Sequence, residues 1–125
     1  MIIKLTISER LYALALLNQF KGNLETLIDV LEDTKNLRIT DKEWEKADKQ
    51  VTTIIENEKP ITSWAWNDDK GGEKEIDITK STHTYLTEKI KESDDKGIFT
   101  LQDKSAITLS AKLDRKTLKD VLNNK

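Results

Sequence analysis

The chain begins with alternating apolar and polar residues and then changes to a helical period. Within residues 2–7, Ile3, Leu5 and Ile7 fall on one side and polar residues on the other, which is the pattern of a half-buried strand. Nearly every position from 11 to 20 is apolar, and a helix that is apolar on most of its circumference belongs at the centre of a fold. The first segments therefore predict a strand followed by a central helix.

Several further segments have helical periodicity. Leu24, Leu27, Ile28 and Leu31 recur at helical spacing, which predicts a helix over residues 24–34 that packs with this face against the first. Thr40-Asp41-Lys42-Glu43 matches a capping box and begins a third helix. Two more helices are predicted, from 79 to about 95 and from Thr100 to 113.

The middle of the chain contains strand-forming residues. Residues 51–55 are all β-branched, so this stretch is compatible with either the end of the third helix or a strand. Pro60 ends any helix before it, residues 61–66 alternate, and residues 67–72 are typical of a turn. We therefore expect a hairpin over residues 61–78. With residues 2–7 it would form a small antiparallel three-stranded sheet packed against four to five helices, an α+β fold.

A weak internal similarity indicates duplication of a strand-helix unit. Lys4–Glu9 is similar in kind to Glu75–Lys80, and Arg38–Asp41 is similar to Ile98–Leu101. We expect one domain over residues 1–125, with two related halves at about 1–57 and 73–113 and a C-terminal extension over 114–125. The length is sufficient for a hydrophobic core.

Composition limits the classes of function. The 125 residues include 21 basic and 23 acidic residues, for a net charge of −2, and no cysteine. Disulfides and thiolate metal sites are excluded, and the charge balance disfavours nucleic acid and anionic lipid as partners. Because the sequence shows no signal peptide and no membrane-spanning run, we expect a cytoplasmic protein that does not associate with membranes.

Candidate catalytic residues are sparse. His83 is the only histidine and lies among serine and threonine residues at the start of a predicted helix, where a surface or capping role is more common than catalysis. Acidic pairs fall at turns and helix ends, and Asp68-Asp69 is the least implausible metal site among them. We therefore expect no enzyme activity, no cofactor and no bound metal. A metal-dependent enzyme at the acidic turn is the least favoured alternative.

Trp64 and Trp66 are the main candidates for binding. They are two positions apart, so they lie on the same side of a predicted strand, and Lys70 and Lys74 are close by in the sequence. Such aromatic residues usually pack into a core, but they also serve as protein interfaces or as stacking platforms for single-stranded bases. A protein partner is our main hypothesis, and single-stranded nucleic acid is the alternative.

The C-terminal segment contributes a second candidate surface. Leu118, Val121 and Leu122 lie at helical spacing outside the internal repeat. With the strongly apolar helix over 11–20, they suggest a homodimer that completes the burial of apolar surface.

The order of these motifs resembles a group of small uncharacterised proteins encoded by bacteriophages and prophages. The resemblance rests on Thr6–Leu11, Thr40–Glu43, Trp66–Asp68, Glu75–Ile78 and Thr100–Asp103. It implies a phage accessory protein in the cytoplasm of an infected bacterium, with a host or phage protein as partner and a host defence system as one target. It carries over no catalytic residues.

Overall fold

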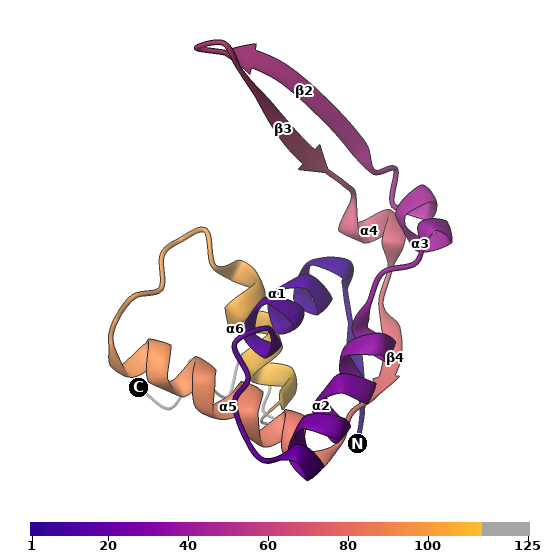
Figure 1. Cartoon of the computed structure of the whole chain (residues 1–125). Helices are drawn as coiled ribbons and strands as arrows, with labels where there is room; N and C mark the ends of the chain where they lie inside the picture. Colours follow the sequence, from indigo (N-terminus) through magenta and orange to yellow (C-terminus); the bar gives the residue numbers. More distant parts are fainter. Residues whose placement is uncertain (114–125) are drawn as a thin grey trace. The chain divides into compact units, whose positions relative to one another are not determined.

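The computed structural model describes residues 1–113 and divides into two compact units (Figure 1). Unit 1 contains Met1–Arg38 and the described residues from Glu73 onward, and unit 2 contains Ile39–Gly72. The elements in chain order are β1 (Ile2–Leu5), α1 (Ile7–Leu17), α2 (Leu24–Leu37), α3 (Asp41–Lys46), β2 (Gln50–Glu56), β3 (Lys59–Ala65), α4 (Asp68–Gly71), β4 (Lys74–Asp77), α5 (Lys80–Asp95) and α6 (Lys104–Leu113). The expected α+β class is confirmed.

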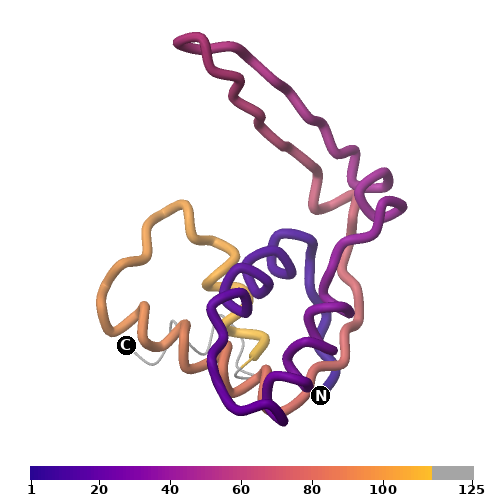
Figure 2. The backbone as a smooth tube through the Cα atoms, in the orientation of Figure 1, coloured from indigo at the N-terminus to yellow at the C-terminus, as the bar shows by residue number. Residues whose placement is uncertain are grey.

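Unit 1 is a helical assembly around α1 with one small sheet. β1 pairs with β4 in antiparallel register, from Ile2 opposite Asp77 to Leu5 opposite Lys74. Figure 2 shows these two segments side by side although they are far apart in the sequence. Helix α1 contacts β1, α2, α5 and α6, which confirms its predicted central place. The core consists of apolar residues from all of these elements: Ile3, Leu5, Ala13, Leu17, Val30, Leu37, Ile76, Ile78, Leu86, Ile90, Leu109 and Leu113.

Threonine side chains set the starts of the helices that follow β1 and β4. Thr6 accepts a hydrogen bond from the Glu9 amide, and the Glu9 carboxylate accepts from the Thr6 amide, which completes a capping box. Thr79 is the N-cap of α5 in the same way, with one residue between it and the end of β4. The strand-helix unit therefore occurs twice. The internal sequence similarity does not align the two caps, however. It pairs Thr79 with Ser8, whereas the cap of α1 is Thr6.

A buried arginine closes the C-terminal end of α2. Arg10 is 1% exposed, and its guanidinium donates to the Leu37 carbonyl at 3.0 Å and to the Arg38 carbonyl. These carbonyls have no partner within the helix, and a cation is favourable at this end of the helix dipole. Arg10 thus joins α1 to the end of α2.

A buried carboxylate joins α2 to the start of α5. Asp33 is 2% exposed, and its Oδ2 accepts from the Thr79 amide at 3.0 Å, the Thr79 hydroxyl at 2.7 Å and the Thr82 hydroxyl. The carboxylate supplies acceptors to the first turn of α5, where the helix dipole favours negative charge. One side chain therefore satisfies three donors from a neighbouring element.

An ion pair connects the start of α1 with the end of α6. The Lys112 ammonium donates to Glu9 Oε1 at 2.5 Å and to Glu73 Oε2 at 3.0 Å, and the Glu9 side chain is only 3% exposed. Burial alone would lower the pKa of Lys112, but the hydrogen bonds to Glu9 and Glu73 outweigh burial and raise this pKa. The charged lysine therefore stabilises the folded state.

Replacing Lys112 by methionine is expected to remove a pH-dependent part of the stability. Because the folded-state pKa lies above the ordinary value of about 10.4, the contribution is complete below that value and is lost as pH rises through the folded pKa. From pH 8 to pH 11.5 the free energy of unfolding in urea should fall more for the wild type than for Lys112→Met, by about 1 kcal/mol. Lys4→Met, which removes an exposed pair with Glu75 at 4.0 Å, should follow the wild type. Parallel curves for Lys112→Met and the wild type would contradict the assignment.

Unit 2 contains a hairpin and two short helices. Thr40 and Glu43 form the predicted capping box at the start of α3. Helix α3 contacts α4, and the Asn67 amide donates to the Ala47 carbonyl at 2.8 Å. Ala47 is fully buried. Strands β2 and β3 pair with each other in antiparallel register.

Several sequence-based expectations are corrected by this arrangement. The three-stranded sheet is wrong: the described residues form two separate two-stranded sheets, β1 with β4 and β2 with β3. The hairpin over 61–78 is also wrong, because β3 pairs with the preceding β2, and residues 68–71 form α4 rather than a simple turn. Residues 51–55, left open between helix and strand, are strand. Along the chain, unit 2 is inserted within unit 1.

The predicted inward face of α2 is a further correction. The buried residues of this helix are Val30, Asp33 and Leu37, whereas Leu24, Leu27, Ile28 and Leu31 are exposed. The predicted extension over 114–125 lies outside the described residues.

Candidate functional site

The β2–β3 hairpin is the most exposed apolar element of unit 2. Its turn residues Asn57 and Glu58 have φ values of 53° and 65°. Positive φ at both central positions is typical of the type I′ turn, whose twist suits a two-residue hairpin, and asparagine tolerates this conformation. No residue of either seven-residue strand is buried.

The register separates the hairpin into two different faces. In an antiparallel pair, directly opposed residues share a face, and successive residues alternate between faces. One face carries no charge and is called here the uncharged face: Val51, Thr53, Ile55, Pro60, Thr62 and Trp64. The opposite face carries Gln50, Thr52, Ile54, Glu56, Lys59, Ile61, Ser63 and Ala65.

The large side chains of the uncharged face are open to solvent. Exposed fractions are 80% for Ile55, 58% for Trp64 and 56% for Val51. Thr53 and Thr62 lie opposite each other in the middle, with their hydroxyls 3.3 Å apart. An isolated two-stranded hairpin is marginally stable in water, so a hairpin with both faces exposed is suited to binding a partner.

Tryptophans and one lysine order the end of the hairpin next to α3. Trp44 and Trp66 meet edge to face with ring centroids 5.4 Å apart, and Trp66 Nε1 donates to Asp68 at 2.8 Å. The Lys49 ammonium lies 3.8 Å from the Trp64 ring centroid and 4.6 Å from that of Trp44. These cation–π contacts hold Trp64 at one edge of the uncharged face.

The predicted binding residues do not form one group. Trp64 lies on the uncharged face of β3, but Trp66 follows the strand and is half-buried against Trp44. The Lys70 ammonium pairs with Asp48. Lys74 lies on β4 in unit 1, and the predicted interface residues Leu118, Val121 and Leu122 lie outside the described residues.

Other residues of the site were not singled out from the sequence. Lys49 contacts two tryptophans, and Val51, Thr53 and Ile55 supply half of the uncharged face. The β-branched run 51–55 was the available signal. This signal is ambiguous in the sequence, because most of the residues that pair with the run also fit the expected hairpin over residues 61–78.

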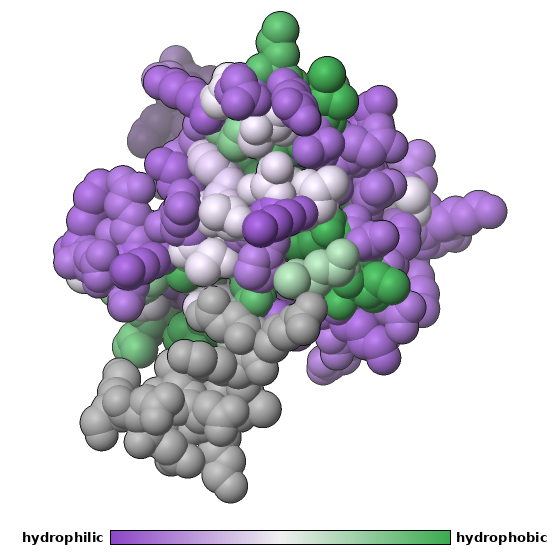
Figure 3. Space-filling view, turned by 90° about the horizontal axis from the view of Figure 1, so that it is seen from below, coloured by the Kyte–Doolittle hydropathy of each residue, from purple (hydrophilic) through white to green (hydrophobic). Residues whose placement is uncertain are grey.

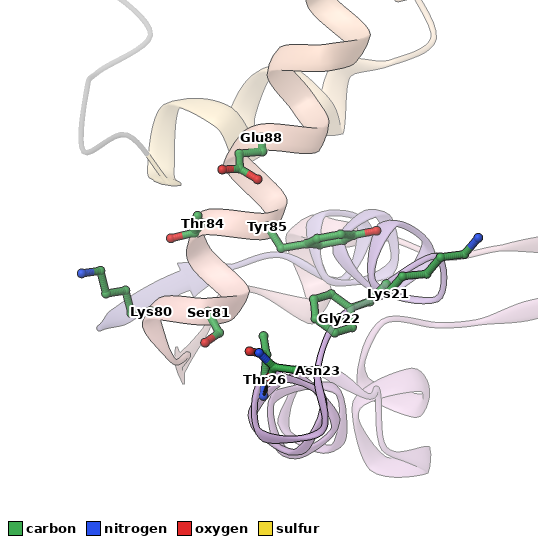
Figure 4. Close-up of a pocket in the computed structure, with 10 residues that line it drawn as sticks. Lys21, Gly22, Asn23, Thr26, Lys80, Ser81, Thr84, Tyr85 and Glu88 are labelled. Carbon is green, nitrogen blue, oxygen red and sulfur yellow. Dashed lines mark hydrogen bonds between the residues drawn. The ribbon is translucent and has the colours of Figure 1, made fainter.

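A separate open pocket lies in unit 1 between α5 and the start of α2. Its volume is about 460 Å³, and Figure 4 shows Ser81 facing Asn23 and Thr26 across it. The rings of Tyr85 and Phe20 pack edge to face with their centroids 5.0 Å apart, and the Tyr85 hydroxyl donates to the Leu16 carbonyl. These contacts give the two aromatic rings a structural role at one wall.

The polar residues around this pocket do not form a catalytic arrangement. Ser81 and Thr84 are hydroxyl residues of the lining, but His83 is not part of it, and its Nε2 is hydrogen-bonded to the Leu113 carbonyl. The start of α5 already has the Asp33 carboxylate as an acceptor. We therefore assign no chemistry to this pocket.

The acidic side chains and the single histidine are the candidate metal ligands of this chain. Within residues 1–113, no group of three or more histidine, aspartate or glutamate side chains is placed to hold an ion. At the acidic turn, Asp68 accepts the hydrogen bond from Trp66, and Asp68 and Asp69 belong to the first turn of α4. In the same part of the chain, no helix has both the length and the apolar character required to cross a bilayer.

Comparison with known proteins adds no family. No family model, no curated protein and no solved structure matches this chain.

Proposed function

We propose that this protein is a non-enzymatic accessory protein that acts by binding another protein through the β2–β3 hairpin. The observation that supports this proposal is the uncharged face, where Val51, Ile55 and Trp64 are each more than half exposed. Burying large apolar side chains is worth about 1.5–3 kcal/mol each. A partner that covers this face would gain several such contributions.

The hairpin offers two complementary modes of binding. Its uncharged face provides apolar and threonine side chains, and both strands lie at sheet edges in the described structure. An edge strand has backbone donors and acceptors that pair with a strand of another protein. Trp64, held by Lys49, is a preordered aromatic anchor of the kind that dominates interface energies.

The resemblance to small phage proteins supports the biological context of the proposal. A protein encoded by a phage would act in the cytoplasm of the infected bacterium, where the partner is either a host defence protein or another phage protein. Single-stranded nucleic acid is less well supported, because the six residues of the uncharged face carry no charge, the neighbouring Lys49 ammonium already lies over the Trp64 ring, and Lys70 is paired with Asp48.

Two matched double variants test the proposal. Thr53→Lys with Ile55→Lys places two charges on the uncharged face, and Thr52→Lys with Ile54→Lys places the same charges on the opposite face of the same strand. Tagged proteins are cross-linked in the infected bacterium, and captured proteins are quantified by mass spectrometry. We expect a defined protein with the wild type and the opposite-face variant, and at least about tenfold less with the uncharged-face variant.

Two results would contradict the proposal. Equal capture by the two variants would show that the uncharged face does not bind the partner. Salt-dependent quenching of tryptophan emission by oligonucleotides, with no protein captured, would favour the nucleic-acid alternative.

A further inference from the structure

Helix α2 has a second apolar face that is exposed in the part of the chain that the structure describes. Its outer stripe is formed by Leu24, Leu27, Ile28 and Leu31, with exposed fractions of 77%, 42%, 65% and 52%. The exposed face of a helix is ordinarily polar, but the exposed face of α2 is apolar. The face of α2 that packs against the core carries a charged residue, the buried Asp33. Figure 3, which views the molecule from below, shows a mostly hydrophilic surface that apolar side chains interrupt in separate places. The outer stripe is therefore an unusual feature of unit 1.

Acidic residues lie along one side of the outer stripe. At about 100° per residue, Glu25, Asp29 and Glu32 fall together on the same flank of α2. Within residues 1–113, none of the three carboxylates forms an ion pair with a cation. The helix thus combines an apolar stripe with an unneutralised acidic flank, which makes its surface selective for a partner's charge.

The charges disfavour a second copy of the same helix as the occupant. The spacing of the stripe is symmetrical, so two antiparallel copies could match Leu24 with Leu31 and Leu27 with Ile28. A two-fold axis would, however, place the acidic flanks of both copies on the same side of the contact. A parallel pair would instead bring the two Lys35 side chains together, because Lys35 continues the stripe one turn after Leu31.

We propose that the outer stripe of α2 binds an amphipathic helix of another protein that carries basic residues along one flank. Apolar residues of such a helix would cover the stripe, while its lysines or arginines would lie against Glu25, Asp29 and Glu32. This is the helix-docking mode of recognition, with charge complementarity selecting the partner. The same acidic flank repels an anionic membrane surface, which otherwise attracts amphipathic helices. The surface is distinct from the hairpin in unit 2.

Synthetic peptides of opposite charge test this proposal directly. The basic peptide has leucine at the spacing of the outer stripe and lysine at the positions corresponding to Glu25, Asp29 and Glu32, and the acidic peptide has glutamate there. Affinity for the full chain is measured by fluorescence anisotropy. We expect the basic peptide to bind at least about tenfold more tightly than the acidic one, with a difference that decreases at high salt.

Variants of the full chain identify the surface. Glu25→Lys with Glu32→Lys should reverse the preference between the two peptides, and Ile28→Asp should weaken binding of the basic peptide about tenfold or more. The hairpin variant Thr53→Lys with Ile55→Lys should bind it like the wild type. This result separates the present inference from the proposed function, since either can fail alone.

Several outcomes would overturn the inference. Equal affinity for the two peptides, or no binding of either, would remove it. Self-association that Ile28→Asp abolishes would assign the stripe to a second copy. Residues 114–125 contain Arg115, Lys116 and Lys119 beside three apolar residues, so Leu118→Asp with Leu122→Asp is also tested. If this variant binds the basic peptide about tenfold more tightly than the wild type, the chain's own C-terminal segment competes with the peptide and is the occupant of the outer stripe.

Discussion

Replacing Arg10 by methionine is expected to destabilise the protein by about 3 kcal/mol. The guanidinium is 1% exposed and donates to the carbonyls of Leu37 and Arg38, which end α2. Methionine fills much of the same space but donates no hydrogen bond, so these carbonyls lose a charged donor in a buried position. The loss is measured as the change in the free energy of unfolding in urea.

Arg38→Met provides the matched control for this experiment. Arg38 is exposed at the C-cap of the same helix, and its replacement should change stability by less than about 0.5 kcal/mol. Arg10→Lys should recover only part of the loss, because an ammonium cannot reproduce the planar fork that reaches two carbonyls. A loss below about 1 kcal/mol for Arg10→Met would show that Arg10 does not hold the end of α2.

Replacing Asp33 by alanine is expected to cost a similar amount, about 3 kcal/mol. Its Oδ2 accepts three hydrogen bonds at the start of α5, from Thr79 and Thr82, and alanine would remove the acceptor from two part-buried donors of Thr79 and the buried hydroxyl of Thr82. Asp33→Asn keeps the shape and one acceptor oxygen, and should lose about half as much. Urea unfolding of the three proteins gives the order directly.

Glu32→Ala is the control for Asp33→Ala. Glu32 is the preceding residue on α2 and is exposed, so we expect a change below about 0.5 kcal/mol. Similar losses for Glu32→Ala and Asp33→Ala would mean that loss of an acidic residue from α2, rather than the contact with α5, determines the effect.

Periodicity predicted where helices occur more successfully than which side of a helix faces the core. The positions of β1, α1, α2 and α5 followed from apolar spacing and caps, but α2 packs with its other face inward. Its core side carries Asp33, a polar residue that is tolerated there because Thr79 and Thr82 on α5 donate to it. Such a partner comes from a distant segment and leaves no local signal, and the same holds for Arg10.

The hairpin shows how local signals compete. Pro60 was interpreted as the end of a helix, but it lies in β3, an edge strand in the described structure, where proline is tolerated. The turn at Asn57-Glu58 lacks the glycine that usually marks a type I′ turn, so the turn-rich residues 67–72 were the stronger signal. The exposure of Trp64 cannot be predicted without knowing that β3 pairs with β2, because alternation alone does not show which face of a strand is in contact with water.

The insertion of unit 2 within unit 1 has a consequence for the order in which the chain folds on the ribosome. β1 is made before unit 2, but its pairing partner β4 emerges only after all of unit 2 has been synthesised. The β2–β3 pairing involves neighbouring residues and pays a smaller loop-closure entropy, so unit 2 can form while the apolar residues of α1 still lack most of their contacts. The nascent segment that contains α1 consequently needs protection from aggregation until α5 and α6 have been made.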